Sequence, residues 1–475
     1  MFIDGDWSDA ASGATVEATS PATGESLGPV AEGSREDARR AIAAANAAFH
    51  AWGARTGFER GALLHRVADV VERRSDELAR VLTLDQGKPL KAEAEVEVGE
   101  LIEFFRMAAE DGKRLEGSIP QSAAPGRRVL LLRRPLGVLG LITPWNWPYT
   151  MPAEVLAPAL ACGNTVVWTP APSTSVCSGL LAECVAEADL PPGVFNFVLG
   201  PGPEVGDELA VNPGTHAVAF TGSTETGLIV SRQAAGKAQL LEMGGNGPLV
   251  VLQDADLAAA AEAARVGSFL GAGQSCSAAE RILVHEAVRD EFVSLLASEV
   301  EREVRLGDPL DDATTMGPVN NEPGAAKMDA HVADAVERGA TVVTGGSRAD
   351  GFPTGLYWEP TVLSDVPPDS IAVTQETFGP IAPVVAIRSL EDAIEQTNAQ
   401  TYGLMAAIFT ADLAAGMRYA DSVAMGLVNI NETTNYWEPH LPWGGRARSQ
   451  SGIGRVGGRY PMDTLTELQT VLIQA

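Results

Sequence analysis

Short apolar runs alternate with alanine-rich stretches through most of the chain beyond residue 128. The first runs occupy 137–145, 164–170, 193–200, 215–222, 239–245 and 247–252, and a second set occupies 281–288, 340–346, 381–387, 403–410 and 426–431. Each run is rich in β-branched or other apolar residues, and the stretches between the runs have helical character. This alternation predicts parallel βαβ units, and therefore two α/β domains that each contain a doubly wound sheet.

Residues 35–115 have a different pattern, which is dense in Ala, Glu and Arg. It predicts helices that pack through one face and expose charged side chains on the other. Ser34, followed three residues later by Asp37, is typical of the amino-terminal cap of a helix. We therefore expect this region to support the fold and to take no direct part in chemistry.

Two further apolar runs lie far from the predicted sheets in sequence. They are "GRRVLLLRRPLG" at 126–137 and "LTELQTVLIQA" at 465–475. Both are strand candidates, and an exposed apolar strand edge invites pairing with another subunit. The sequence therefore predicts a homo-oligomer, either a dimer or a tetramer.

Composition narrows the class of protein. A chain of 475 residues is longer than one hydrophobic core can accommodate, so two or three domains are expected. The four cysteines form no CxxC pair, so we expect neither disulfides nor a metal site, and a reducing cytoplasm fits best. A net charge of −28 disfavours nucleic acid as a partner. The start "MFIDGDWSDA" does not resemble a signal peptide, and no apolar run approaches the roughly 18 residues that span a bilayer, so no membrane association is expected.

Candidate binding chemistry first occurs in "FTGSTETG", residues 220–227, which follows a predicted strand and opens a helical stretch. Gly222 and Gly227 would let the backbone approach a pyrophosphate at the helix amino terminus. The spacing differs from the GxGxxG of the common dinucleotide fold. Taken alone, the motif fits an ordinary strand-to-helix turn equally well.

Three polar residues stand in positions that suit catalysis. Glu242 ends a strand-like run just before a Gly-Gly pair, Asn146 lies in the rigid loop "PWNWP", and Cys276 lies among small residues that leave its sulfur accessible. Each also has a plain structural interpretation: a capping glutamate, a turn asparagine and a small buried residue. The other cysteines, Cys162, Cys177 and Cys184, have apolar or helical surroundings and are expected to be buried.

These motifs together resemble the aldehyde dehydrogenase superfamily. The segments "PWNWP", "LAPALACGNTVV", "FTGSTETG", "LEMGG", "GQSCSAAER", "ETFGP", "YGL" and "GLVNIN" occur in the family's order, and the similarity extends from "FIDGDW" to the last strand. The separation of 34 residues between Glu242 and Cys276 (276 − 242 = 34) also matches.

The resemblance implies a domain division and a fold. Residues 1–120 and 139–242 would form the cofactor-binding domain, 243–440 the catalytic domain, and 121–138 with 441–475 the oligomerisation and bridging segments. The expected fold is α/β, with two doubly wound Rossmann-like domains and a small β element for oligomerisation.

The resemblance also implies how the site works. Cys276 would attack the aldehyde carbon, the Asn146 amide and the Cys276 backbone N–H would bind the oxyanion, and Glu242 would activate the water that hydrolyses the thioester. The implied cofactor is NAD, with NADP as the alternative. The residues expected around it are Thr143, Pro144, Trp145, Thr169, Pro170, Gly222, Ser223, Gly227, Met243, Gly244, Glu376 and Phe378.

The sequence departs from the family's pattern at two places. The usual Lys-Pro-x-Glu that holds the adenine ribose is replaced by residues 169–172, Thr-Pro-Ala-Pro. The missing lysine would attract the 2′-phosphate of NADP and the missing glutamate would repel it, so the two losses oppose each other. A slight preference for NAD remains, because no other arginine or lysine stands in this strand. The usual lysine nine residues after the asparagine, and a glutamate near the carboxyl terminus, are replaced by Val155 and Val456. Losing both avoids an unpartnered buried charge, and we expect Glu242 to exchange its proton through water in the channel.

The expected substrate is an aromatic or medium apolar aldehyde, because the implied tunnel is rich in aromatic residues. Its expected lining is Trp147, Met151, Glu154, Ser275, Ser277, Tyr436, Trp437 and Trp443. Glu154 stands at a position that faces the tunnel in the family, where a carboxylated semialdehyde usually meets an arginine, so such substrates are disfavoured. Arg446 and Arg448 could bind an anion instead, but a solvated loop is the expected role of their segment. An amino- or trimethylammonio-aldehyde is the second candidate, because acidic and aromatic side chains together stabilise a cation.

Two other functions remain as alternatives. One is a CoA-acylating dehydrogenase, which Glu242 argues against because a thiol acceptor does not need that base. The other is a non-catalytic cofactor-binding protein with the same fold, which the presence of Cys276, Glu242 and Asn146 argues against.

Overall fold

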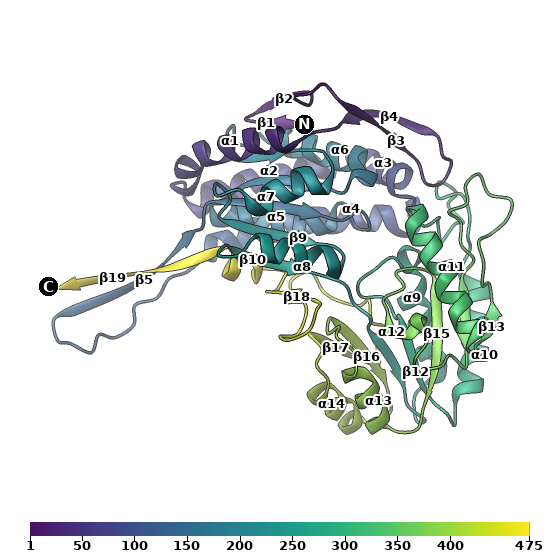
Figure 1. Cartoon of the computed structure of the whole chain (residues 1–475). Helices are drawn as coiled ribbons and strands as arrows, with labels where there is room; N and C mark the ends of the chain where they lie inside the picture. Colours follow the sequence, from purple (N-terminus) through teal and green to yellow (C-terminus); the bar gives the residue numbers. More distant parts are fainter. Residues whose placement is uncertain (475) are drawn as a thin grey trace.

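A computed structural model describes residues 1–474; Ala475, the last residue of the predicted segment 441–475, lies outside the described residues. The first domain is built on an eight-stranded sheet (Figure 1). Its parallel centre consists of β6 (Val138–Thr143), β7 (Thr165–Pro170), β8 (Phe195–Phe197), β9 (Ala217–Thr221) and β10 (Ala238–Glu242), in the order β10-β9-β6-β7-β8. These strands are the first five predicted runs. The chain moves from β6 outward through β7 and β8, then returns to place β9 on the other side of β6, which is the doubly wound arrangement.

Antiparallel strands from the two ends of the chain complete this sheet. β1 (Phe2–Ile3) pairs with β8 and carries β2 (Asp6–Trp7), whereas β18 (Gly452–Ile453) pairs with β10. A separate hairpin of β3 (Thr15–Thr19) and β4 (Ser26–Ala31) precedes the first helix. The carboxyl-terminal segment thus reaches the strand that ends in Glu242.

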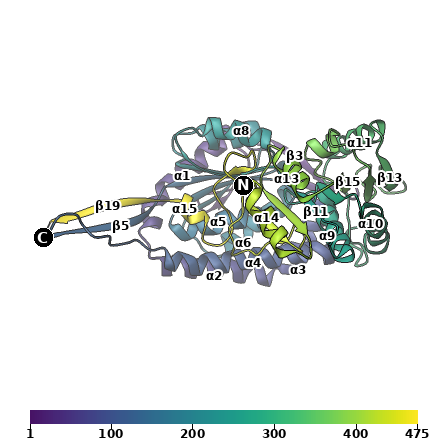
Figure 2. The ribbon, with the colours of Figure 1, turned by 90° about the horizontal axis from the view of Figure 1, so that it is seen from below.

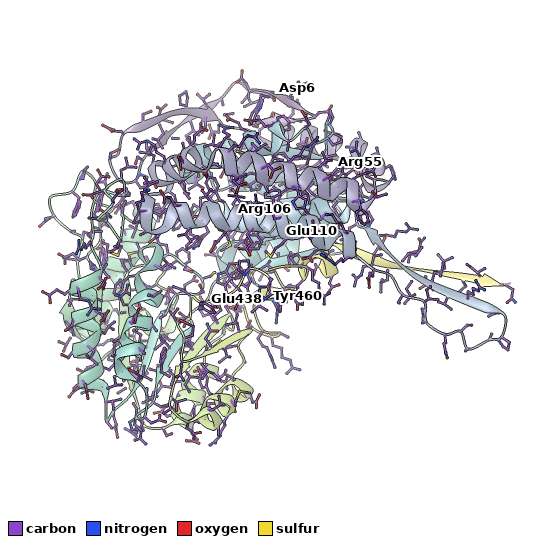
Figure 3. All side chains as sticks on the ribbon, turned by 180° about the vertical axis from the view of Figure 1, so that it is seen from behind. Asp6, Arg55, Arg106, Glu110, Glu438 and Tyr460 are labelled. Carbon is purple, nitrogen blue, oxygen red and sulfur yellow. The ribbon has the colours of Figure 1, made fainter. Side chains whose placement is uncertain are left out.

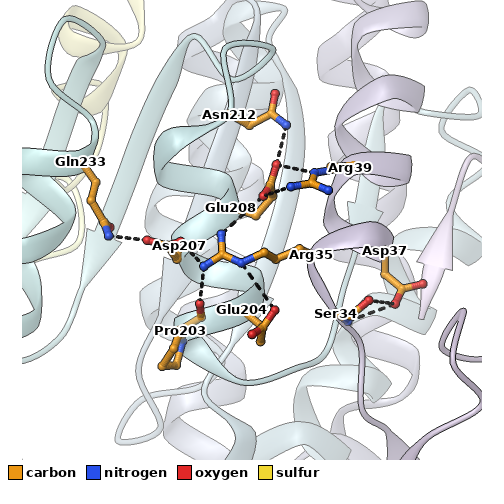
Figure 4. A network of polar contacts seen from close by, with 10 residues as sticks. All are labelled: Ser34, Arg35, Asp37, Arg39, Pro203, Glu204, Asp207, Glu208, Asn212 and Gln233. Carbon is orange, nitrogen blue, oxygen red and sulfur yellow. Dashed lines mark hydrogen bonds and ion pairs between the residues drawn. The ribbon is translucent and has the colours of Figure 1, made fainter.

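Helices cover both faces of the sheet. They are α1 (Arg35–Gly53), α2 (Gly57–Arg73), α3 (Ser75–Gln86), α4 (Glu95–Asp111), α5 (Thr150–Cys162), α6 (Ser175–Glu187), α7 (Asp207–Val211) and α8 (Thr224–Gln233). The predicted cap at α1 is present: Asp37 accepts hydrogen bonds from the Ser34 backbone and hydroxyl, and Arg39 reaches across to Glu208 of α7 (Figure 4). On α4, Arg106 and Glu110 lie on the outer helical face seen in Figure 3.

The second domain contains the sixth predicted run and the second predicted set. Its seven strands lie in the order β13 (Thr341–Thr344), β14 (Thr361–Ser364), β15 (Ile381–Ile387), β12 (Arg281–His285), β11 (Pro248–Val251), β16 (Met405–Phe409) and β17 (Leu427–Ile430), and only β13 is antiparallel to its neighbour. Five longer helices and one short one pack around them: α9 (Leu257–Phe269), α10 (Arg289–Glu303), α11 (Glu322–Glu337), α13 (Leu390–Asn398) and α14 (Leu413–Ser422), with α12 (Ile371–Thr374) as the short one. The sequence analysis did not identify β14, whose four residues include two hydroxyl side chains.

The two isolated apolar runs form one element. β5 (Arg127–Pro135) and β19 (Thr466–Gln474) pair antiparallel, from Pro135 opposite Thr466 to Arg127 opposite Gln474, and this arm projects from the body (Figures 1 and 2). Leu468 and Leu472 share one face of the arm and are more than half exposed. The predicted strands are present, and within the chain they pair with each other. Among the described residues, no helix combines the length and apolar character needed to cross a bilayer.

A buried asparagine joins the base of the arm to the first sheet. The side-chain oxygen of Asn164 accepts hydrogen bonds from the N–H groups of Leu136 (2.8 Å) and Gly137 (3.1 Å), and its amide nitrogen donates to the Leu465 carbonyl (2.9 Å). Asn164 therefore connects the end of β5 with the start of β19 through one side chain.

We expect Asn164→Ala to destabilise this junction. The substitution leaves buried backbone groups without partners, each of which costs about 1–3 kcal/mol, so the thermal unfolding midpoint should fall by several degrees. Asn398→Ala is the matched control, because Asn398 also bridges two backbone groups, Ala424 N–H and Ser422 C=O, but at an exposed site. Equal midpoints for the two variants in a thermal scan would contradict this role.

Candidate active site

A cleft opens at the carboxyl ends of β6, β9 and β10, where the strand order of the first sheet reverses. Ligands of doubly wound sheets bind at such points. The cleft has a volume of about 280 Å³ and also borders the second domain. Its walls are Pro144, Trp145, Asn146, Met151, Thr221, Gly222, Ser223, Glu242, Gly244, Gln274, Cys276, Pro323, Gly324, Lys327, Glu376, Thr377 and Phe378.

Cys276 lies in the loop between α9 and β12 of the second domain. The loop turns sharply, because Gly271, Ala272 and Gly273 all have positive φ angles of 62°, 54° and 69°. It also lies directly against the loop that follows β10: a Cβ atom at Gly245 would overlap the Cys276 carbonyl oxygen. The second glycine of the "LEMGG" motif is thus required for the close approach of the two domains.

Glu242 is the last residue of β10 and lies across the cleft from the second domain. Its side chain is buried and lies near enough to the Cys276 thiol for the two groups to influence each other's pKa, while its Oε1 atom has no partner within the described residues. A buried carboxyl oxygen without a partner is costly unless a ligand or water binds it. The geometry provides a base beside the sulfur with an oxygen left to bind water.

Burial controls the ionisation of this pair. Burial, and then the nearby Glu242, Glu376 and Glu154 carboxylates, raise the pKa of the Cys276 thiol well above its usual value. Burial and the charges of Glu154 and Glu376 likewise raise the pKa of Glu242. The Cys276 thiol is therefore protonated at neutral pH.

Asn146 faces the same cleft from the loop after β6. Its amide nitrogen donates one hydrogen bond to the backbone oxygen of Gln274 at 3.0 Å. A primary amide has two N–H groups, so the second remains for a ligand oxygen. Gln274 is held in turn, because its side-chain oxygen accepts the N–H of Asn320 at 2.9 Å.

The outer part of the cleft fits a dinucleotide. α8 begins at the cleft with Ser223 as its cap, and the first turn of a helix attracts phosphate. Trp145 and Phe378 meet edge to face, with ring centroids 5.6 Å apart. Glu376 accepts the N–H of Gly245 at 2.8 Å, which places a carboxylate on the wall where a ribose hydroxyl could donate to it. These features provide a phosphate site, an aromatic wall and a hydroxyl acceptor next to Cys276.

Several residues expected at the cofactor lie outside the walls of the cleft. Thr143 accepts a hydrogen bond from Trp168 at 2.8 Å, and Thr169 and Pro170 end β7 opposite Ile142 and Thr143 of β6. Met243 belongs to an apolar cluster beneath α8, and a Cβ atom at Gly227 would overlap its sulfur. The structure therefore gives Gly227 a different reason from the expected one: it allows α8 to pack closely on Met243.

A narrower tunnel of about 90 Å³ reaches Cys276 from the other side. Of the expected substrate residues, Trp147, Met151, Ser275, Ser277, Trp437 and Trp443 line it, together with Glu100, Thr150, Leu270, Met405 and Asn435. Ser277 is fixed by hydrogen bonds with Ser275 (2.9 Å) and Asn435 (2.8 Å). The described lining contains three tryptophans and no arginine or lysine, although Lys88 packs against it with its Nζ 3.7 Å from the Trp147 ring centroid.

Two expected tunnel residues lie elsewhere. Tyr436 is 48% exposed and its hydroxyl points to Glu438. Glu154 is fully buried behind the wall, where it accepts a hydrogen bond from the Trp443 indole at 3.4 Å. The reason is that α5 is buried on all sides, so the face that carries Glu154 packs against other parts of the protein and does not border the tunnel.

The acidic residue of the tunnel is instead Glu100, on α4. Its carboxylate accepts a hydrogen bond from Thr150 at 2.8 Å, and burial raises its pKa to about 7. Sequence reasoning missed Glu100 because it belongs to a charged helix far from every motif. It also missed Lys327 of α11, which lies on the cleft wall, because no motif surrounds this residue in the sequence.

Comparison with known proteins agrees with this geometry. The profile of the aldehyde dehydrogenase family matches residues 7–471. The chain belongs to the aldehyde dehydrogenase family. It is 39% identical to the succinate-semialdehyde dehydrogenase [NADP(+)] GabD of Escherichia coli (strain K12), over 99% of this chain and 97% of that protein. It is 38% identical to the betaine aldehyde dehydrogenase of Bacillus subtilis (strain 168), over 99% and 96%.

Solved structures show the same fold. An NADP-dependent enzyme from E. coli superimposes with a TM-score of 0.97 at 39% identity, covering 100% of this chain and 98% of the other. A betaine aldehyde dehydrogenase from Staphylococcus aureus in complex with NAD+ superimposes with a TM-score of 0.96 at 34% identity, covering 100% and 94%. The predicted fold, two Rossmann-like α/β domains, and the predicted family are confirmed.

This aldehyde dehydrogenase differs from the family pattern in its interior. Val155 and Val456 are both buried in the apolar core of the first domain. Val456 is paired by two backbone hydrogen bonds with Trp443, of 3.0 and 3.1 Å, and so supports the tunnel wall. At these two positions, apolar side chains that pack in the core thus stand where the family resemblance led us to expect charged ones.

The thiol pKa leads to a test with iodoacetamide on cofactor-free enzyme. Labelling of Cys276 should be slow at pH 7 and should rise beyond pH 9, and Glu242→Gln should shift this profile to lower pH because a repelling carboxylate is removed. Mass spectrometry of the labelled peptide gives the rate. Cys276→Ala is the control, since Cys276 lines the cleft whereas Cys162, Cys177 and Cys184 are buried and line neither the cleft nor the tunnel. Superimposable profiles for wild type and Glu242→Gln would show that Glu242 does not control the thiol.

Proposed function

We propose that this aldehyde dehydrogenase oxidises an aldehyde to the carboxylic acid with NAD(P), through a covalent bond to Cys276. The observation that carries the proposal is the meeting of Cys276, Glu242 and Asn146 in one cleft, next to an aromatic tunnel that also reaches Cys276. In this proposal, residues 1–120 and 139–242 bind the cofactor and 243–440 supply the nucleophile.

The first half of the reaction forms a thiohemiacetal. The Cys276 thiolate adds to the aldehyde carbon, and the free N–H of the Asn146 amide with the Cys276 backbone N–H binds the resulting oxyanion. Glu242, which faces the same cleft as Cys276, is placed to take the thiol proton. The nicotinamide, when bound, supplies the acceptor for the hydride that leaves this carbon.

The second half hydrolyses the thioester. Glu242 takes a proton from water, the hydroxide adds to the thioester carbon, and the Cys276 thiolate leaves as the acid is released. The free Oε1 of Glu242 suits this step better than transfer to CoA, which needs no base. Since residues 155 and 456 are both valine, we propose that Glu242 returns its proton through water in the cleft.

We propose an aromatic or medium apolar aldehyde as substrate. The tunnel wall of Trp147, Trp437 and Trp443 with Met151, Leu270 and Met405 supports an apolar tail. Several relatives are named for semialdehydes that end in a carboxylate. The lining of this tunnel contains Glu100 and no cationic side chain, so it would repel such a carboxylate.

Glu100 supports a second candidate, an amino- or trimethylammonio-aldehyde. A carboxylate among tryptophan rings stabilises a cationic tail. Its pKa of about 7 means that the ionised form dominates above neutral pH.

For the cofactor we propose NAD before NADP. No arginine or lysine occurs in residues 165–173, so this strand offers no cation to a 2′-phosphate.

The first experiment measures formation of reduced cofactor from NAD and NADP in parallel, without CoA, across aromatic, aliphatic, ammonium-bearing and carboxylated aldehydes. We expect turnover that falls by about 10³-fold or more in Cys276→Ala. Glu242→Gln should give one rapid burst of reduced cofactor followed by slow turnover, because the thioester accumulates. Turnover that requires CoA would refute the hydrolytic reaction.

Glu100→Gln then separates the two substrate classes. For an ammonium-bearing aldehyde, kcat/KM should fall about 10- to 100-fold, since a hydrogen bond or contact with a charged partner is worth about 1.5–3 kcal/mol. For an apolar aldehyde it should change little. Glu103→Gln, an exposed change on the same helix, is the control. A uniform loss for all aldehydes would mean that Glu100 only supports the tunnel wall.

We also propose that the arm of β5 and β19 joins copies of this chain into a dimer or tetramer. Leu468 and Leu472 leave apolar surface exposed on the arm. Leu468→Asp with Leu472→Asp should reduce the mass measured by light scattering after size exclusion. Wild-type protein that is already monomeric at micromolar concentration would contradict the proposal.

A further inference from the structure

Glu280 is a buried carboxylate that the proposed reaction does not use. It lies four residues after Cys276, immediately before β12. Its two oxygens accept the backbone N–H groups of Thr377 (2.6 Å) and Phe378 (2.8 Å), both from the loop of residues 375–380 between α12 and β15. One side chain beside the nucleophile thus holds two consecutive peptide groups of a loop about a hundred residues further along the chain.

The loop that Glu280 holds forms one wall of the cofactor cleft. It carries Glu376, which accepts the N–H of Gly245, and Phe378, which meets Trp145 edge to face. Phe378 has a positive φ of 59°, a conformation that bulky residues rarely adopt and that the surroundings must therefore enforce. The bond from the Phe378 N–H to Glu280 is made at this strained residue.

The same loop also touches the nucleophile loop directly. A Cβ atom at Gly273 would overlap the carbonyl oxygen of Gly379. Thr377 is held from the other side by His331, whose Nδ1 lies 3.0 Å from the Thr377 hydroxyl. Without Glu280, two buried N–H groups would lose their acceptors, and Phe378 would lose the contact that favours its conformation.

We propose that Glu280 is a positioning residue that couples the nucleophile loop to the cofactor wall. Its carboxylate fixes the loop of residues 375–380 so that Glu376 and Phe378 face the cleft in the arrangement that binds the dinucleotide. The proposal rests on the proposed function for the identity of the ligand, and it concerns cofactor binding before any chemistry.

The charges around Glu280 give the coupling a pH dependence. Burial and the neighbouring Glu376 raise the pKa of Glu280 to about 8, against the opposing effects of the two N–H donors and Lys327. Arg281 and Tyr402 are the other titratable groups that interact with it, and both keep their protons near pH 8, whereas burial lowers the pKa of His331 to about 4 and leaves it neutral. The ionised carboxylate accepts both N–H groups, so the loop is held more firmly above pH 8 than at pH 7.

The test is a titration of NADH, and of NADPH in parallel, by fluorescence on the full-length enzyme without aldehyde. In Glu280→Gln only one oxygen remains to accept, and the amide NH₂ faces the other N–H. We expect the dissociation constant of the reduced cofactor to rise about 10-fold at pH 8.5. Hydrogen exchange at residues 375–380 should become faster, while the KM for aldehyde at saturating cofactor should stay within about twofold.

The matched control is Asp254→Asn. Asp254 accepts backbone N–H groups of Ala411 and Asp412 at the opposite end of the same sheet, so the substitution makes the same chemical change away from the cleft. Its dissociation constant should equal that of the wild type. An unchanged constant in Glu280→Gln, or an equal loss in Asp254→Asn, would overturn the proposal.

The pH profile provides a second readout. The dissociation constant of the wild type should fall between pH 7.5 and 9, with an inflection near 8 that Glu280→Gln lacks; a profile shared by both proteins would overturn the role of the charge. Glu376, whose pKa burial raises to about 7, is present in both proteins, so the difference between the two profiles reports on Glu280. If Glu280→Gln does not fold, Glu280→Asp replaces it: the shorter carboxylate cannot reach both N–H groups, and unchanged binding would again overturn the proposal.

The outcomes also separate this inference from the proposed function. Tight binding of reduced cofactor without turnover of any aldehyde would reject the dehydrogenase reaction but leave the role of Glu280 intact. Normal turnover together with a cofactor dissociation constant that Glu280→Gln does not change would support the dehydrogenase reaction and reject the role of Glu280.

Discussion

The backbone contact between the loop after β10 and the nucleophile loop is the constraint on which the site depends. Gly245 lies so close to the carbonyl oxygen of Cys276 that no side chain fits between them. Glu242 comes from the first sheet and Cys276 from a loop of the second domain, so this contact sets the distance between base and nucleophile. A rigid approach of two backbones fixes that geometry better than flexible side chains could.

Buried carboxylates are the second theme of the site. Glu100, Glu154, Glu242, Glu280 and Glu376 all lie in or just behind its walls, and burial raises the pKa of each. Most of their partners are backbone or side-chain N–H and O–H groups rather than cations. Such carboxylates are held in place while their protons remain exchangeable, which suits a site that must move a proton away from a thiol and later from water.

The tunnel wall depends on residues that lie behind it. Val155 and Val456 pack where the family resemblance led us to expect charges, and the backbone of Val456 is hydrogen-bonded to that of Trp443. The Trp443 indole donates to the buried Glu154, and its ring forms the tunnel wall. The aromatic lining is therefore supported by an interior that differs from the family pattern, and Glu100 remains as the one carboxylate in contact with the tunnel.

The sequence by itself determined the fold, the family and the three residues proposed for catalysis, because alternating apolar runs and ordered motifs are local features. It also identified the strands of the arm, although not that β5 and β19 pair with each other. Only the tertiary structure decided that Glu100 lines the tunnel while Glu154 lies behind it, that Gly227 serves packing against Met243, and that Glu280 holds the loop of Phe378. These facts depend on which side of a buried helix faces a cavity and on contacts between residues about a hundred positions apart, and no local pattern encodes either.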